Sequence, residues 1–163
     1  MQATTESVLE ILFEGAPGLR LRCQPEPGES IDHVLDRAEG IARSMPEDAQ
    51  IELLNAHPRI GAAPSSVSAM SYAEQGYDRD PGTSELQARL DTLNEEYERK
   101  FGFRFCVFVA GRSRAEIADL MDSHMDAKRQ DELHRALTDV FAIARDRATK
   151  FSISNVEEAR ADR

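Results

Sequence analysis

Apolar residues recur every three or four positions along most of the chain, which is the period of an amphipathic helix. Capping signatures of the type Ser-x-x-Glu or Ser-x-x-Gln precede three of these segments, at Ser44, Ser84 and Ser113. Ser30 can cap the segment that begins at residue 31, Gly15 and Pro17 can end the first segment, and Gly102 can end the segment over 84–101. The pattern predicts helices near residues 8–13, 31–42, 47–56, 84–101, 113–121 and 128–150, a polar connection over 61–82 and a frayed polar tail over 152–163.

Residues 103–109 (FRFCVFV) have a different pattern, because their aromatic and β-branched side chains favour a strand. No second run of this kind is present to pair with them, and a lone strand cannot satisfy its backbone groups in a sheet. We expect an extended segment that crosses a helical core and leaves some backbone N–H and C=O groups for a ligand. A buried apolar connector without a ligand fits the same pattern.

A length of 163 residues fits one domain, so we predict a single-domain, all-α helical bundle over residues 1–163. The formal net charge of −10 argues against a nucleic-acid partner, which needs a basic face. The same charge repels an anionic ligand, so local cations would have to hold one.

Two cysteines and four histidines show no metal-binding spacing, and we expect no metal site. The widely separated Cys23 and Cys106 also argue against a disulfide framework and fit a reducing compartment. No apolar run approaches the roughly 20 residues that span a membrane. The first residues lack a signal-peptide pattern, and we therefore predict a cytoplasmic protein.

His57 and Pro58 stand just after a predicted helix, which the residue before a proline tends to end. A histidine fixed there by a stiff backbone can act as an acid or a base near neutral pH. A histidine that only caps the last helix carbonyls explains the same pattern. Taken alone, the pattern favours that second interpretation.

Ser71, Glu74 and Gln75 would share one face if this part of the polar connection were helical. Together they could present a hydroxyl, a carboxylate and an amide to one small polar molecule. Ser71-x-x-Glu74 is also a capping box, which is the simpler interpretation. Only Gln75 is unexplained by the capping box.

Arg147 falls about 60° from the centre of the apolar stripe on the last predicted helix, and Arg145 falls about 100° away. An arginine within an apolar face needs an anion or a paired carboxylate to offset its desolvation. Arg147 could therefore bind an anionic ligand, or it could snorkel or form a structural ion pair. We expect Arg145 to be a solvated charge.

Five segments in order resemble one family, the decarboxylases that act on 2-oxo-4-hydroxy-4-carboxy-5-ureidoimidazoline (OHCU), an intermediate between urate and allantoin. The resemblance covers about residues 8–150. The segments are LFEGAPGL, LLNAHPRIG, SYAEQ, LNEEYERKFGFRFCVFVAGRSRAEI and AIARDRA.

This resemblance implies an all-α fold, usually dimeric, that decarboxylates an anionic ureidoimidazoline without a metal or an organic cofactor. It implies catalytic roles for His57, Glu74 and Arg147, with Arg147 matching the family better than Arg145. The substrate-binding residues that it implies are Pro58, Ser71 and Gln75, together with the backbone of Phe105, Cys106, Val107, Phe108 and Val109.

The chain departs from the family pattern at several positions near these residues. Arg59 replaces an aspartate after His-Pro and would add a cation near an anionic substrate. Arg104 stands where the family has the proline of FGFPF, Ala110 where a basic residue is common, and Gly76-Tyr77 where small residues follow Glu-Gln. These changes bear on the subfamily and on substrate detail more than on the type of reaction.

Two other functions fit parts of the pattern. A non-catalytic helical protein could keep the pocket to bind a ureide or purine metabolite, but the set of His57, Glu74, Gln75 and Arg147 argues for catalysis. A structural or partner-binding bundle would need none of these residues.

Overall fold

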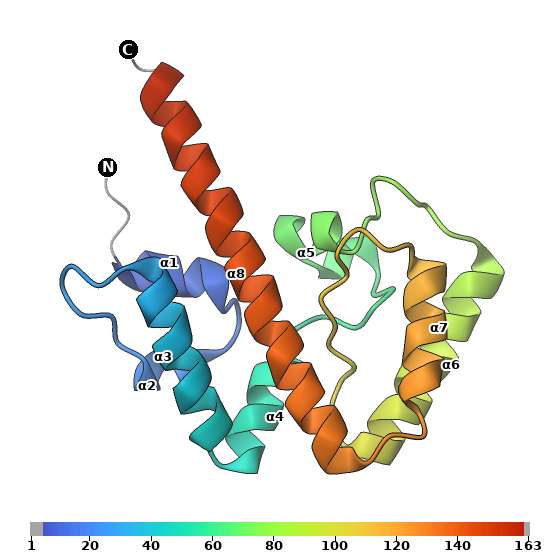
Figure 1. Cartoon of the computed structure of the whole chain (residues 1–163). Helices are drawn as coiled ribbons and strands as arrows, with labels where there is room; N and C mark the ends of the chain where they lie inside the picture. The colour runs from blue at the N-terminus through green and yellow to red at the C-terminus, as the bar shows by residue number, and fades with distance from the viewer. Residues whose placement is uncertain (1–4, 162–163) are drawn as a thin grey trace. The chain divides into compact units, whose positions relative to one another are not determined.

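The computed structural model describes residues 5–161, and its regular secondary structure over that range consists of helices, as the all-α prediction requires (Figure 1). No strand occurs among these residues. The helices are α1 (Thr5–Leu12), α2 (Pro17–Arg22), α3 (Ile31–Ser44), α4 (Glu47–Asn55), α5 (Ala69–Glu74), α6 (Ser84–Phe101), α7 (Arg114–His124) and α8 (Arg129–Ala161), with a short 3-10 helix at Pro64–Ser66.

Local capping signals place several helix ends correctly. Ser30 caps α3 by accepting a hydrogen bond from the N–H of His33. Ser113 and Glu116 form the predicted capping box at the start of α7. Gly102 ends α6 in the left-handed conformation, with φ of 81°, which glycine adopts without steric cost.

Two predicted caps are wrong. Ser44 belongs to the last turn of α3, where its hydroxyl donates to the carbonyl of Gly40, so α4 begins after Pro46 without a side-chain cap. Thr83 rather than Ser84 caps α6, by accepting a hydrogen bond from the N–H of Leu86. Thr83 and Ser84 both carry a hydroxyl that could cap this helix, and only the backbone geometry determines which of them does.

The structure has one helix that was not predicted, α2, and one that is longer than predicted, α8. Pro17 follows the end of α1, as expected, but it also begins α2, where the missing N–H of proline has no helical partner to lose. α8 continues past Lys150 to Ala161, so the backbone of the predicted polar tail is helical up to that residue. Residues 162–163 lie outside the described range.

The described chain divides into two compact units, and the single domain of the sequence analysis stays a prediction. The first unit contains residues up to Ala56 and from Leu137 onward, and the second contains His57–Ala136. α8 therefore contributes its first residues to the second unit and the rest to the first. Both units contain buried apolar side chains.

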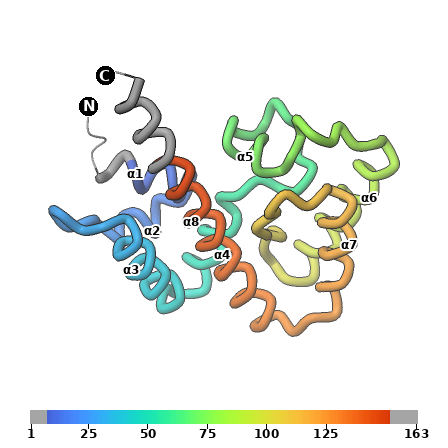
Figure 2. The backbone as a smooth tube through the Cα atoms, turned by 45° about the horizontal axis from the view of Figure 1, so that its top comes forward, coloured from blue at the N-terminus to red at the C-terminus, as the bar shows by residue number. Residues whose placement is uncertain are grey.

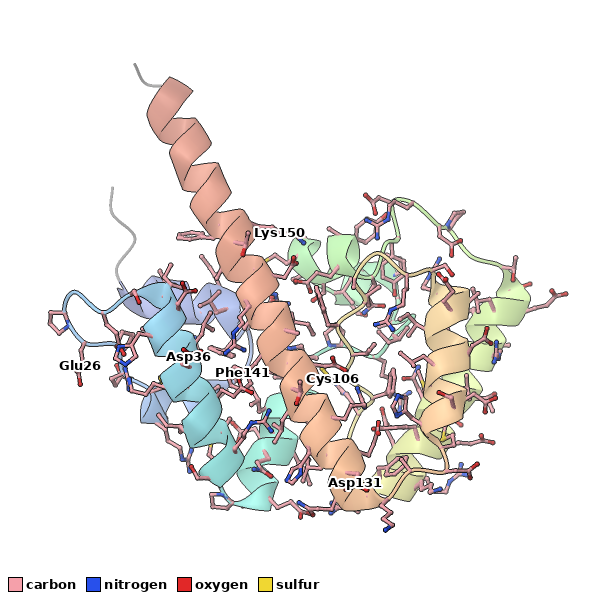
Figure 3. The ribbon with its side chains drawn as sticks, viewed as in Figure 1. Glu26, Asp36, Cys106, Asp131, Phe141 and Lys150 are labelled. Carbon is pink, nitrogen blue, oxygen red and sulfur yellow. The ribbon has the colours of Figure 1, made fainter. Side chains whose placement is uncertain are left out.

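In the first unit, α2 packs on α3 and α4. Phe13 and Phe141, the latter labelled on α8 in Figure 3, meet edge to face with ring centroids 5.4 Å apart. Buried aromatic pairs of this geometry contribute about 1 kcal/mol beyond their area. They fix the part of α8 that carries the two candidate arginines.

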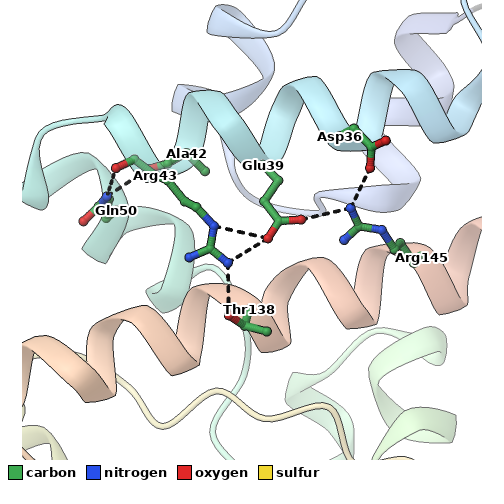
Figure 4. A network of polar contacts seen from close by, with 7 residues as sticks. All are labelled: Asp36, Glu39, Ala42, Arg43, Gln50, Thr138 and Arg145. Carbon is green, nitrogen blue, oxygen red and sulfur yellow. Dashed lines mark hydrogen bonds and ion pairs between the residues drawn. The ribbon is translucent and has the colours of Figure 1, made fainter.

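A polar network also ties α3 to α8 within this unit (Figure 4). Glu39 accepts hydrogen bonds from Arg43 at 2.7 Å and from Arg145 at 2.9 Å. Arg43 reaches Thr138, and Arg145 reaches Asp36. Partial burial raises the pKa of Glu39, but the two arginines outweigh it and hold that pKa below its usual range.

In the second unit, α6 and α7 pack side by side (Figure 2). Tyr97 of α6 is fully buried and contacts three phenylalanine rings at centroid distances between 4.5 and 5.9 Å. Two of those rings, Phe103 and Phe105, belong to the segment that follows α6. The aromatic cluster therefore anchors this segment on α6.

Candidate functional site

The connection after α4 carries the candidate histidine. α4 ends at Asn55, before Pro58, as predicted, and His57 and Pro58 are both half-buried. We call residues 57–62 the histidine loop. Side chains from three parts of the second unit bind its backbone.

Gln75, the residue that closes α5, holds the middle of the histidine loop. Its Oε1 accepts a hydrogen bond from the N–H of Gly61 at 2.9 Å, and its Nε2 donates to the carbonyl of Arg59 at 3.1 Å. The side chain is buried. These two bonds explain the residue that the capping interpretation left unexplained.

Two of the departures from the family pattern also act on this loop. Arg104, in place of proline, donates to the carbonyl of His57 at 3.1 Å. Arg59 makes two hydrogen bonds with Glu98 of α6, at 2.8 and 2.6 Å. Glu98 therefore balances the charge of Arg59, and the expectation that Arg59 offers an additional cation to the substrate is not supported.

The helix that carries Ser71 begins earlier than a capping box at Ser71 would require. Ser68 is the N-cap of α5, and its hydroxyl accepts from the N–H of Ser71 at 3.2 Å. Ser71 is thus an interior helix residue, and the capping interpretation is wrong. Ser71, Glu74 and Gln75 follow one another at helical spacing, with Ser71 and Gln75 buried and Glu74 half-buried.

The segment 103–109 is extended and forms no strand, as predicted (Figure 3 labels Cys106 on it). Arginine side chains bind three of its carbonyl oxygens. Arg135 donates to Cys106 at 3.0 Å, and Arg112 donates to Phe108 at 2.6 Å and to Val109 at 3.0 Å. These three carbonyls therefore already have side-chain partners.

Arg135 also links this segment to a buried carboxylate, Glu132, that the sequence analysis did not single out. Glu132 of α8 accepts from Tyr97 at 2.7 Å and from Arg135 at 2.6 Å, and lies 3.0 Å from Nδ1 of His124. Burial raises the pKa of Glu132, but Arg135 and Tyr97 outweigh it and hold that pKa below its usual range. Burial, reinforced by Glu132, raises the pKa of the Tyr97 hydroxyl.

Glu132→Gln should lower the free energy of unfolding by about 3 kcal/mol, because the change leaves the charge of Arg135 without its carboxylate in a buried network. Chemical denaturation followed by circular dichroism measures this loss. The control is Glu39→Gln, which also removes a carboxylate between two donors but at a more exposed site, and should cost about 1 kcal/mol or less. Equal losses would contradict the structural role of Glu132.

The two candidate arginines of α8 differ as the apolar stripe predicts. Arg147 is buried, with 4% of its surface exposed, and its Nη1 donates to the carbonyl of Ile11 at 3.4 Å. The side chain of Arg145 is 41% exposed and pairs with Asp36 and Glu39, so it is an ion-paired residue and not simply a solvated charge. Arg147 belongs to the first unit, and its place beside the histidine loop stays a prediction.

Two features of other functional classes are absent from the part of the chain that the structure describes. No group of three or more His, Cys, Asp or Glu side chains is arranged to hold a metal ion. No helix within the described range is both long and apolar enough to cross a membrane.

Comparison with known proteins gives a consistent result. The family model of the OHCU decarboxylases matches residues 1–149. A 2-oxo-4-hydroxy-4-carboxy-5-ureidoimidazoline decarboxylase from Halalkalicoccus jeotgali is 32% identical over 136 residues, which cover 82% of this chain and 76% of that protein. The uric acid degradation bifunctional protein PucL of Bacillus subtilis is 28% identical over 147 residues, covering 87% of this chain. This chain spans only 29% of the length of that larger protein.

A solved structure has the same fold. The crystal structure of an OHCU decarboxylase in the presence of (S)-allantoin superimposes with a TM-score of 0.70 and 21% sequence identity, covering 88% of this chain and 96% of that one. At this identity the likeness concerns the fold.

Proposed function

The chain belongs to the OHCU decarboxylase family, and we propose that it decarboxylates OHCU to (S)-allantoin in urate degradation. The observation that carries this proposal is the match of the family model over residues 1–149. The activity assigned is that of a carboxy-lyase.

The chemistry of the substrate explains how such an enzyme works without a cofactor. OHCU carries a hydroxyl and a carboxylate on one ring carbon, and the neighbouring ring carbon is part of a C=N bond. When the bond to the carboxylate breaks, CO2 leaves, the electron pair of that bond forms a C=C bond to the neighbouring ring carbon, and the C=N electrons move to the ring nitrogen, which takes up a proton; an enol remains. Protonation of the carbon that carries the ureido group, on one face, and loss of the enol O–H proton then give (S)-allantoin. The ring itself accepts the electrons.

We assign His57 to proton transfer at the substituents of the carbon that loses CO2. Glu74 orients the ureido N–H groups and helps to fix the protonation state of the histidine. Arg147 binds an anionic oxygen. A bond to the carboxylate alone would stabilise the bound substrate as well as the transition state. Arg147 therefore speeds the reaction only if it also binds the oxygen on which negative charge develops.

The remaining contacts come from Ser71, Gln75, Pro58 and the backbone of residues 105–109. The two hydrogen bonds of Gln75 to the histidine loop use one of its N–H groups and one oxygen lone pair. An amide has a second of each, so Gln75 has the capacity both to hold the loop and to bind the ring of the substrate. Since arginines bind the carbonyls of Cys106, Phe108 and Val109, we assign the N–H groups of this segment to the ring carbonyl.

The proposal is tested with freshly generated OHCU, whose spontaneous decay sets the baseline. We expect the purified chain to accelerate the disappearance of OHCU in proportion to its concentration. If allantoin raises the melting temperature of the protein but the protein leaves the decay rate of OHCU unchanged, the protein is a non-catalytic binder instead. If the protein shows no acceleration and no thermal shift, a structural or partner-binding bundle is favoured.

The expected dimer follows from the resemblance, and the expected location follows from the two widely separated cysteines, which fit a reducing compartment. We propose a cytoplasmic homodimer. Sedimentation equilibrium tests the assembly, and the expected mass is about twice that of the monomer.

A further inference from the structure

The histidine loop has an unusual set of partners, because side chains bind the backbone of nearly every residue in it. In addition to the bonds from Gln75 and Arg104, Asn94 Nδ2 donates to the carbonyl of Ile60 at 2.9 Å. Gln87 Nε2 donates to the carbonyl of Gly61 at 2.9 Å, and the hydroxyl of Tyr77 donates to that of Ala62. A loop whose conformation is fixed only by its own turn hydrogen bonds would not need side-chain partners from α5, from α6 and from the extended segment.

The backbone of this loop is also shaped to fit α6 closely. Gly61 has a positive φ of 77°, and a Cβ built on it would lie 2.9 Å from Cδ1 of Leu90. Only glycine satisfies both conditions at this position. The side chain of Ile60 is buried next to it. The loop therefore has one well-defined position on α6.

Asn94 is the most informative of these partners because its environment does not favour it. Its side chain is 1% exposed, and its Nδ2 donates both to Ile60 and to the carbonyl of Leu90 at 2.8 Å. Its Oδ1, however, is buried without a hydrogen-bond partner among the described residues. A buried acceptor without a partner destabilises the fold, so an apolar residue would suit α6 better. What Asn94 supplies in return is the bond to the histidine loop.

We propose that Asn94 is a positioning residue that fixes the histidine loop and thereby holds His57 in its reactive orientation. The inference rests on the proposed function, since it assigns a residue to the same reaction. Asn94 does not touch the substrate. It acts by holding the Ile60 carbonyl, three residues from His57, while Gln75 holds the residues on either side of Ile60.

The matched pair Asn94→Leu and Gln50→Leu separates positioning from stability. Gln50 is a buried amide in the first unit whose Nε2 also donates to two backbone carbonyls, those of Ala42 and Arg43. Both variants remove an amide of this kind, so both should lower the melting temperature. Only Asn94→Leu should lower kcat, by about 10- to 100-fold with KM within about twofold, because misplacing a catalytic group by about 1 Å costs that much.

A double-mutant cycle tests whether Asn94 acts through His57. In a His57→Asn background, Asn94→Leu should change the residual rate less than twofold, because there is no catalytic imidazole left to position. A loss of kcat equal in Gln50→Leu, or one that persists in full without His57, overturns the proposal.

Amide hydrogen exchange of Gly61 gives a readout that does not depend on activity. We expect faster exchange in Asn94→Leu and unchanged exchange in Gln50→Leu, and unchanged exchange in both would overturn the proposal. If unaltered protein fails to accelerate OHCU decay, the proposed function is wrong, and the exchange result then decides the loop contact by itself. Should Asn94→Leu fail to fold, the half-buried Gln87→Leu, which removes the bond to Gly61, should show the same kcat loss at smaller size.

Discussion

His57→Asn should reduce kcat by about 1,000-fold while the protein stays folded. Asparagine is close to histidine in size and can still donate a hydrogen bond, but it cannot transfer a proton near neutral pH. His57 is half-buried in a loop whose backbone is held by the side chains of other residues, and these bonds remain in the variant. Stopped-flow absorbance of OHCU measures the rate, and circular dichroism measures the fold.

His134→Asn is the matched control for this change. His134 is exposed on α8 of the second unit, and we expect its variant to keep kcat within about twofold of the unaltered protein. Full activity in His57→Asn would contradict the assignment of proton transfer. Equal losses in both variants would point to a general effect of removing a histidine.

Arg147→Gln should lower kcat/KM by about 100- to 1,000-fold, the usual cost of losing a donor to an oxygen that becomes charged in the transition state. The fall should lie mainly in kcat, because the proposed role is to hold charge that develops as CO2 leaves. The buried Arg147 also binds the carbonyl of Ile11, so the melting temperature is measured in parallel.

Arg145→Gln, two residues away on the same helix, provides the comparison. It removes ion pairs with Asp36 and Glu39, and should keep kcat/KM within about twofold. A variant of Arg147 that changes only KM would show that the arginine grips substrate and transition state equally. A larger loss in Arg145→Gln than in Arg147→Gln would reverse the choice between them.

The features that could be predicted from the sequence are local ones. The cap at Ser30, the capping box at Ser113 and the stop at Gly102 depend on residues within one helical turn. The burial of Arg147 and the exposure of Arg145 follow from the angular positions of the two residues on one helix. In each case the information lies within a single helix and its ends.

The contacts that build the candidate site are not local. Gln75 meets the histidine loop across 14 residues, Asn94 across 34, and Tyr97 meets Glu132 across 35. No periodic pattern encodes contacts between residues so far apart in the sequence. The roles of Asn94 and Glu132 could therefore not be predicted, although both residues stand beside apolar stripe residues. Their one signal in sequence is a polar residue next to a buried face, and most residues of that kind are simply solvated.

The optical activity of the product tests the central claim most directly. The account predicts that circular dichroism of a reaction started from fresh OHCU develops the signal of (S)-allantoin at a rate proportional to the concentration of this protein, and that His57→Asn abolishes the increase. An enzyme that protonates one face of the enol must give one enantiomer in excess. A racemic product formed at the spontaneous rate in the presence of folded, unaltered protein would contradict it.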